Sequence, residues 1–199
     1  MLKANNISFS YNPHLLILDK VDLNVQPGEV VGVYGQSGIG KSTLANIIAG
    51  YLQPDSGTIT VDGIVHPQKG RNPVQLIGQH PEKAINPYWQ MKQVLDESGT
   101  YSDEFLDELG ISKEWMHRYP SQLSGGELQR FCLARAIAPE TKYLIADEMT
   151  TMLDAITQAQ IWQTVLQLVA DRQLGVLVIS HEMPLMKQIC NRIIDFKEI

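Results

Sequence analysis

Apolar residues follow two kinds of strand pattern along the chain. In "VDLNV", Val21, Leu23 and Val25 alternate with polar residues, which is typical of a strand with one buried face. "PGEVVGVYG" begins with a turn and continues as a nearly continuous apolar run, and "YLIADE" and "VLVIS" are also mostly apolar. Such runs are typical of strands that are covered on both faces. "ISFSY" and "PDSGTITVDG" predict two further strands. The chain therefore combines half-buried and fully buried strands.

Helical periodicity appears between these strands. "STLANIIAG" predicts a helix that stops at Gly50, and the longest helix is predicted from about Ala155 to Leu174, closed by Gly175. Residues 64–90 show scattered prolines and little periodicity, and are expected to be mainly strand and loop. Strands that alternate with helices indicate an α/β fold with a parallel sheet. The apolar stripe of the long helix consists of Ile161, Val165, Leu168 and Val169.

Three shorter helices are predicted in the middle of the chain. Two of them lie at about 90–97 and 102–109, and Gly110 ends the second. A third should run from Gly125 to about Ala138, because Pro139 cannot continue a helix.

Composition narrows the class of protein. With 199 residues, 44% of them hydrophobic and 19% charged, the chain is expected to form one soluble domain, or one domain with a small insert. No apolar run approaches the roughly 20 residues of a membrane span, and "MLKANNISFSY" lacks signal-peptide regions, so a cytoplasmic location is expected. The net charge of -6 disfavours nucleic acid as a partner. Cys132 and Cys190 lack the spacing of a zinc site and are expected to fill the core.

The stretch "GQSGIGKS" has the spacing of a phosphate-binding loop, directly after a predicted strand and before a predicted helix. Its glycines let backbone N–H groups turn toward phosphates, Lys41 can reach the β and γ oxygens, and Ser42 can ligate magnesium. A flexible turn is the alternative, but this pattern arises by chance in roughly one chain in a hundred of this length. The residues of the predicted nucleoside triphosphate site are Gly35, Gln36, Ser37, Gly38, Ile39, Gly40, Lys41, Ser42 and Thr43.

Two adjacent acids, Asp147 and Glu148, follow the buried run "YLIA". A second parallel strand that ends in an acid can bring its carboxylate beside the phosphate loop, so Asp147 is predicted to hold the water shell of magnesium. Successive strand residues point in opposite directions, which leaves Glu148 to face an attacking water. The simpler interpretation is that acids mark the end of a strand.

The stretch "LSGGELQR" is a second candidate anion site. Ser124 and Glu127 have the spacing of a capping box, which would explain them as a helix start and nothing more. A capping box does not require Gly125 and Gly126 in succession, however, and these leave backbone N–H groups bare at the positive end of a helix.

Together, "GQSGIGKS", "LSGGELQR" and "LIADE" resemble the motifs of the ATP-binding cassette (ABC) ATPases, and the resemblance covers nearly the whole chain. It implies a P-loop NTPase fold with a mixed or parallel core sheet and a small antiparallel β subdomain. A helical subdomain at about 80–122 would be inserted into the single domain 1–199. In that family two cassettes pack head to tail, and each ATP lies between the phosphate loop of one and the signature of the other. The implied cofactors are therefore ATP and Mg²⁺, and the signature residues are Ser124, Gly125, Gly126 and Glu127.

The same resemblance implies four further site residues. Tyr11 in "SFSY" matches the aromatic residue that stacks on adenine, and Gln79 in "LIGQHP" matches the glutamine that senses the γ-phosphate through magnesium. His181 after "VLVIS" matches the switch histidine, and Asp154 in "TMLD" matches the acid that contacts the opposite cassette. Tyr11 could instead pack on a loop, Gln79 could be solvated, and His181 could cap the last helix. The implied magnesium ligands are Ser42, Gln79 and Asp147.

The remaining histidines have no such placement, and we expect them at the surface: His14, His66, His80 and His117.

A closer resemblance is to the ATPase subunits of peptide and nickel importers. It is carried by "NP" at Asn86–Pro87, by "RYPSQLSGGELQR" and by "IADEMTTMLDAITQAQI". Met149 departs from the proline that is usual there, and Met152 departs from a small residue. The chain also stops at "IIDFKEI", short of the extension of many peptide importers, which a truncation or a minimal cassette would both explain.

This resemblance implies an ATP-hydrolysing importer subunit at the cytoplasmic face of the membrane. Glu148 would polarise the attacking water, His181 would contact the γ-phosphate, and Lys41 would stabilise developing charge with magnesium. The expected partners are a second cassette, identical or related, membrane permease subunits that dock on the helical subdomain, and, indirectly, a solute-binding protein. The cargo, whether peptide, nickel or a metal chelate, would be read by other subunits.

Rival functions share part of this pattern. A soluble cofactor-assembly ATPase would share every ATP motif. A DNA-associated ATPase would usually carry a long coiled coil, and none fits between Gln79 and Leu123. A simple kinase would leave "LSGGELQR" unexplained.

Overall fold

The structure is a computed structural model, and it describes residues 1–12, 14–66 and 71–199. The chain divides into two compact units. The first unit comprises Met1–Leu76, Glu140–Glu148 and Leu168–Ile199, and the second comprises Ile77–Pro139 and Met149–Gln167.

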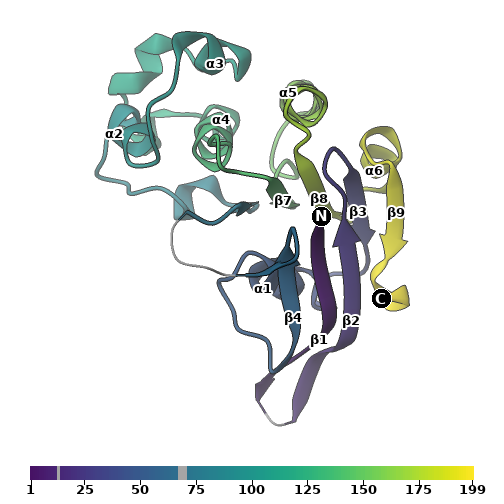
Figure 1. The fold of residues 1–199 in the computed structure, drawn as a ribbon. Helices are drawn as coiled ribbons and strands as arrows, with labels where there is room; N and C mark the ends of the chain where they lie inside the picture. Colours follow the sequence, from purple (N-terminus) through teal and green to yellow (C-terminus); the bar gives the residue numbers. More distant parts are fainter. Residues whose placement is uncertain (13, 67–70) are drawn as a thin grey trace. The chain divides into compact units, whose positions relative to one another are not determined.

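An antiparallel sheet of four strands, in the order β2-β1-β4-β5, forms one layer of the first unit (Figure 1). The predicted alternation in "VDLNV" is confirmed, because Val21, Leu23 and Val25 are buried while the two polar residues between them are exposed. The strands are β1 (Leu2–Asn12), β2 (Leu15–Val25), β4 (Ser56–Val61) and β5 (Ile64–Val65).

A second sheet has the strand order β6-β7-β8-β3-β9, and β3 pairs in parallel with both β8 and β9, as β7 does with β8. The predicted parallel sheet is therefore confirmed. Val33 of β3 and Asp147 of β7 both pair with Ile179 of β8, so the carboxyl ends of these strands lie at the same level. The strands are β3 (Val30–Tyr34), β6 (Val74–Ile77), β7 (Tyr143–Asp147), β8 (Gly175–Ser180) and β9 (Arg192–Asp195).

Helix α1 (Lys41–Ile48) shares one hydrophobic core with both sheets of the first unit. Its residues Leu44, Ile47 and Ile48 belong to the same buried cluster as residues of β1, β2, β4, β7 and β8. The helix ends as predicted, because Gly50 follows its last turn with a left-handed φ of 81°. This packing fixes the phosphate loop, which joins β3 to α1, against the sheet.

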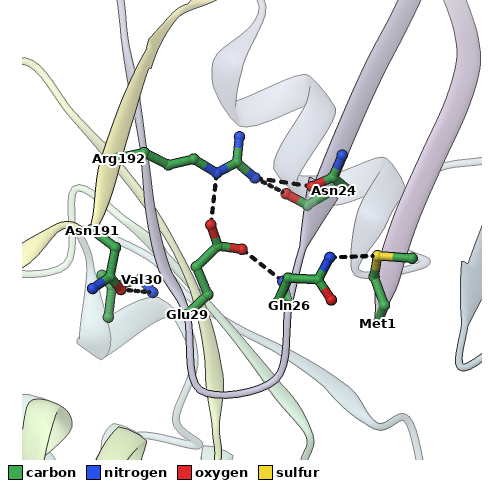
Figure 2. Close-up of polar contacts among 7 residues, drawn as sticks. All are labelled: Met1, Asn24, Gln26, Glu29, Val30, Asn191 and Arg192. Carbon is green, nitrogen blue, oxygen red and sulfur yellow. Dashed lines mark hydrogen bonds and ion pairs between the residues drawn. The ribbon is translucent and has the colours of Figure 1, made fainter.

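Helix α6 (Met183–Ile189) and strand β9 lie near the end of the chain, followed by a 3₁₀ turn at Phe196–Glu198. All four residues of β9 are only half-buried, so apolar burial alone holds this edge strand weakly. Polar contacts add to it: the Asn191 side chain accepts a hydrogen bond from the Val30 N–H (2.7 Å). Arg192 donates to Glu29 Oε1 (2.7 Å) and to the Asn24 carbonyl oxygen (2.6 Å) (Figure 2).

The carboxylate of Glu29 also accepts a hydrogen bond from the Gln26 N–H. Burial by itself raises the pKa of Glu29, but the hydrogen bonds from Arg192 and Gln26 and the charge of Arg192 outweigh it, and the net shift is downward. We call these contacts of residues 24, 26, 29, 191 and 192 the β9 latch.

The second unit is mainly helical. The two predicted short helices are confirmed, with Gln90 and Ser102 as N-caps, and Gly110 follows the second with a φ of 64°. The predicted insert at about 80–122 lies within this unit, which also holds α4, and its identity as a separate subdomain stays a prediction. The helices are α2 (Met91–Asp96), α3 (Asp103–Glu108), α4 (Gly125–Ala136) and the first part of α5 (Ala155–Arg172).

Two expectations are wrong. Gly175 does not close α5, since Gln173 adopts the left-handed conformation there (φ 52°) and Gly175 is the first residue of β8. A side chain at Gly175 would lie 2.5 Å from the Tyr143 ring, so the glycine is needed for close strand packing. His66 is not a surface residue either: it is 6% exposed, and its ring hydrogen-bonds to the backbone of Ala49.

Among the residues that the structure describes, no helix is long and apolar enough to cross a membrane.

Candidate active site

The phosphate loop begins directly after β3 and ends in the first turn of α1. Gly40 is the N-cap of α1 and has a left-handed φ of 118°, and a Cβ there would lie 2.9 Å from Ile17. No side chain caps this helix start and its first turn holds no acid. The positive end of α1 is therefore open to an anion, as the sequence predicts.

Lys41 is only 6% exposed although it carries a charge. Its ammonium donates hydrogen bonds to the carbonyl oxygens of Gly35 (2.7 Å) and Gln36 (2.8 Å) at the other end of the loop. The loop thus curls around the ammonium, which its first two carbonyl groups hold in place. This geometry suits the binding of a polyphosphate.

Asp147 lies at the carboxyl end of β7 and forms a hydrogen bond with the Ser42 side chain of the phosphate loop. Burial raises the pKa of Asp147 and the nearby charge of Glu148 raises it further, while Ser42 and Lys41 lower it without cancelling the rise. Its Oδ1 atom is buried and has no hydrogen-bond partner. An ionised Asp147 would therefore have one buried oxygen free to bind a cation.

These two residues fit a magnesium ion. Mg²⁺ prefers oxygen ligands and is usually held by one or two carboxylates together with substrate phosphates and water. Ser42 and Asp147 bring a hydroxyl and a carboxylate together beside the phosphate loop, and the unpartnered Oδ1 supplies a free acceptor. Among the described residues, no group of three or more His, Cys, Asp or Glu side chains could hold a metal ion by itself. A divalent cation here would depend on the nucleotide.

Strand alternation does not set the direction of the Glu148 side chain, contrary to the prediction from the sequence, because Glu148 lies outside the strand. Strand β7 ends at Asp147, and Glu148 has a left-handed φ of 52°, an uncommon and costly conformation for a residue with a side chain. Its N–H donates to the carbonyl of Ile179 (2.9 Å), which holds the turn in place. Its Oε1 atom lies 3.0 Å from Nδ1 of His181, just after β8. The fold thus brings together two predicted catalytic residues.

The alternative role of His181 as a helix cap is not observed, because Glu182 is the N-cap of α6.

Tyr11 lies near the end of β1, and its hydroxyl is 3.2 Å from the hydroxyl of Thr43 in the first turn of α1. The predicted base-binding residue is therefore tied directly to the phosphate loop helix.

Gln79 and the signature residues belong to the second unit. The side-chain amide of Gln79 donates to the hydroxyl of Thr151 (3.1 Å). The signature helix α4 has the predicted capping box: Glu127 N–H donates to Ser124 Oγ (3.3 Å), and Ser124 N–H donates to Glu127 Oε2 (2.6 Å). The roles of these residues toward a nucleotide stay predictions.

The two signature glycines have different structural reasons. A Cβ at Gly126 would lie 2.6 Å from Cγ2 of Thr157, so only glycine lets α4 approach the start of α5 this closely. A Cβ at Gly125 would meet only Leu153, at an ordinary 3.7 Å. Packing therefore explains Gly126, and it does not explain Gly125.

Asp154 caps α5. Its Oδ1 accepts from the N–H groups of Ile156 and Thr157 (both 3.0 Å), and its Oδ2 accepts from the Thr157 hydroxyl (2.6 Å). The Thr157 side-chain hydrogen bond is the main reason that the pKa of Asp154 is lowered. This acid is thus fixed at the same place as the signature helix start.

A pocket of about 390 Å³ opens between the starts of α4 and α5. Sequence reasoning missed Trp115, which lies in a 3₁₀ turn without any motif, and Arg130, which stands inside the quoted signature. Met152 lines this pocket and is exposed, whereas Met149 is buried. The lining residues are Trp115, Ser124, Gly125, Gly126, Glu127, Arg130, Met152, Leu153, Asp154 and Thr157.

Comparison with known proteins identifies the family of the chain. The ABC transporter family matches residues 18–151. The nickel import system ATP-binding protein NikE of Staphylococcus aureus, from strains bovine RF122 / ET3-1 and N315, is 30% identical over 211 residues, which cover 100% of this chain and 87% of the relative.

Solved structures are similar over nearly the whole chain. A dimeric ATP-binding cassette in a post-hydrolysis state, bound to ADP and Pi, superposes with a TM-score of 0.83 at 27% identity, covering 98% of this chain and 94% of that one. An ATP-binding subunit of an ABC transporter gives a TM-score of 0.83 at 21% identity and covers 98% of this chain and 86% of that one, which shows the fold alone. The chain belongs to the ABC transporter family and is one of its ATPases.

Proposed function

We propose that this ATPase drives an import system, for nickel or a metal chelate or for peptides, through separate membrane subunits. The observation that carries the ATP chemistry is the contact of Asp147 with Ser42, where a buried carboxylate oxygen lacks a partner beside the phosphate loop. The importer assignment is supported by relatives named as nickel import ATP-binding proteins, which match this whole chain at 30% identity. Among the cargoes, these relatives favour nickel.

Residues of the first unit would each have a separate role in binding ATP for hydrolysis. When bound, Mg²⁺ would neutralise charge on the phosphate oxygens, and Ser42 and Asp147 would hold it. Lys41 would place its ammonium against the β and γ oxygens, while the open N-terminus of α1 adds backbone donors. Tyr11 would stack on the base. These groups orient ATP before any proton moves.

Glu148 is the general base in this proposal. Its carboxylate would accept a proton from the attacking water as the water approaches the γ-phosphate. His181, at 3.0 Å from Oε1, would orient that carboxylate and contact the γ-phosphate. The turn at Glu148 supports this role, because strained backbone is often kept where a side chain must be aimed.

The second unit would complete the site of a partner cassette. Backbone N–H groups at the start of α4, with Ser124 and Gly125, would bind the γ-phosphate of ATP held by the partner, and Asp154 would contact that partner. Gln79 would report the γ-phosphate through magnesium. A dimeric, ADP-bound relative in the solved structures supports this arrangement. Residues at about 80–122 would dock a helix of a permease at the cytoplasmic face of the membrane.

The proposal is tested by reconstitution. The chain is co-expressed with candidate permease subunits from the same organism, and the complex is placed in liposomes with ATP on the side of the cassette. We expect Mg²⁺-dependent ATP hydrolysis and uptake of radioactive Ni²⁺ that both depend on the matching solute-binding protein. Uptake of a peptide mixture in place of Ni²⁺ would support the peptide alternative within the same proposal.

The transport proposal fails if the chain hydrolyses ATP but never co-isolates with an integral membrane protein from cross-linked cells. That result would favour a soluble assembly ATPase, which uses the same ATP motifs.

A further inference from the structure

Tyr11 is held at two points although its ring is largely exposed. Its hydroxyl lies 3.2 Å from the hydroxyl of Thr43, and its ring meets the ring of Phe9 edge-on, with centroids 4.9 Å apart and planes at 87°. Phe9 and Thr43 are both buried, whereas Tyr11 is 58% exposed. The contact with Phe9 and the hydrogen bond of the hydroxyl hold the Tyr11 side chain, while much of it stays exposed.

The contact between the two hydroxyl groups connects two elements of the first unit, a strand and a helix, that are far apart in the sequence. Tyr11 comes from the antiparallel sheet, and Thr43 follows the predicted magnesium ligand Ser42 in the first turn of α1. Tyr11 lies near the end of β1 and its side chain is largely exposed, so this bond helps to hold it in place. The bond therefore sets where the exposed ring stands relative to the phosphate loop.

An exposed aromatic ring at a fixed distance from a phosphate loop is a stacking platform for a base. Stacking of a base on an aromatic side chain contributes about 1–3 kcal/mol, and that gain is larger when the ring need not be ordered at binding. A ring that is already fixed therefore increases affinity for a nucleotide and leaves affinity for a bare polyphosphate unchanged.

We propose that Thr43 is a positioning residue for base recognition: its hydroxyl holds the Tyr11 ring in the stacking position and so couples the base site to the phosphate loop. This inference rests on the proposed function, because it takes a purine nucleoside triphosphate as the ligand. It assigns the Thr43 side chain to the base, separately from its backbone N–H in the loop.

The test is a double-mutant cycle with two ligands. Tyr11→Phe keeps the ring and removes its hydroxyl, and Thr43→Val keeps the shape and removes the other hydroxyl. Dissociation constants are measured by calorimetry on the full chain for MgATP and for magnesium tripolyphosphate, which has the same phosphates and no base. Tyr11→Ala serves as the variant without any stacking surface.

Each single substitution is expected to weaken MgATP binding about threefold to tenfold, the value of one hydrogen bond. The double variant should bind MgATP no more weakly than the single variants, because both remove the same bond. Thr43→Ser, which restores a hydroxyl, should bind like the wild type. Tyr11→Phe and Thr43→Val should each weaken MgATP binding more than tripolyphosphate binding, whereas Tyr11→Ala should weaken MgATP binding by roughly tenfold or more.

The outcomes separate this inference from the proposed function. If Thr43→Val weakens tripolyphosphate as much as MgATP, or if the two substitutions add in the cycle, then Thr43 contacts phosphate directly and the inference is wrong. The proposed function survives that result, since the wild type still binds MgATP. If the wild type binds no MgATP, the proposed function itself fails. Unfolding midpoints in urea confirm that each variant is folded.

Discussion

Asp147 meets two opposing demands at one position. Its burial opposes ionisation, and its neighbour Glu148 adds a like charge, so the pKa of Asp147 is raised. A magnesium site, in contrast, needs the ionised form. The sign of the effect on stability follows from this shift. A raised folded-state pKa stabilises the protein fully below the unfolded value of 3.8, and this contribution is lost as the pH rises through the folded-state pKa. At neutral pH the nucleotide-free protein therefore carries a destabilising charge.

Asp147→Asn should consequently raise the urea midpoint of the nucleotide-free protein at neutral pH, because the neutral amide removes the buried charge while it can still accept from Ser42. The same change should weaken MgATP binding by at least about tenfold, since the carboxylate that faces magnesium is gone. Equilibrium unfolding with and without MgATP checks both parts. A lower midpoint without nucleotide would contradict the account of the buried charge.

Glu148→Gln should retain MgATP binding and lower the turnover rate by about a hundredfold or more, the usual contribution of a general base. The amide keeps the size of the side chain and its contact with His181, but it cannot take a proton. Steady-state phosphate release and calorimetric binding of MgATP measure the two effects. If Glu148→Gln turns over ATP at the normal rate, the acid merely ends a strand.

The signature helix shows how packing between elements constrains a motif. α4 and the start of α5 approach so closely at Gly126 that a methyl group would overlap Thr157, while Gly125 has room for one. The glycine pair therefore offers a matched comparison in neighbouring positions.

Gly126→Ala should lower the free energy of unfolding by roughly 1–3 kcal/mol, as overpacking does, because α4 must shift away from Thr157. Gly125→Ala should be neutral or stabilise by up to about 1 kcal/mol, since alanine favours the helix and meets no close atom. Urea denaturation of both variants gives the comparison. Equal midpoints for the two would show that the close contact at Thr157 relaxes without cost.

The β9 latch ties an element with little apolar burial to the rest of the first unit, so it should govern acid stability. The folded-state pKa of Glu29 is lowered below 4.5, and its contribution is therefore present above pH 4.5 and lost as the pH falls through the folded-state value. Glu29→Gln should lower the urea midpoint at pH 7 and reduce the loss of stability between about pH 4.5 and pH 3. Urea titrations over this range, with Asp19→Asn as an exposed control, measure it. A parallel decline in both variants and the wild type would leave Glu29 without such a role.

At the scale of the whole molecule, the predicted nucleotide-binding residues are divided between the two units. The first unit holds the phosphate loop, Asp147 and Glu148, and the second holds the signature pocket and Asp154. The signature pocket contains a helix start and fixed polar groups, and the proposed function assigns it to ATP held by a second cassette.

ATP should therefore bring two cassettes together. In the Glu148→Gln background, MgATP should shift the chain to a dimer with its own copy or with the related cassette of the same transporter, as measured by light scattering. Adding Gly125→Asp should abolish this association, because a carboxylate in the pocket repels the γ-phosphate. Association that persists in the double variant would place the partner's ATP elsewhere.

Much of the fold was predictable because local signals and global fold agree. Alternation in β2, the apolar runs of β3, β7 and β8, and the glycines after α1 and α3 all reflect short-range chemistry. β9 escaped prediction because four half-buried residues carry no clear period, and the latch that holds it is built from residues far away in the sequence. His66 was misjudged for a similar reason, since burial of a single polar residue depends on the chain that covers it.

The candidate site shows the same division. The motifs alone predicted the residue types: a loop that binds phosphates, an acid for magnesium, an acid for water and a capped signature helix. Only the tertiary structure decided how they act together. The register of β7 and β3 on β8 sets Asp147 level with the phosphate loop, and a left-handed turn gives Glu148 its contact with His181. The Tyr11–Thr43 bond likewise joins a sheet to a helix. Sequence specifies chemistry through residue identity, whereas distances between remote side chains follow from packing, which no local pattern encodes.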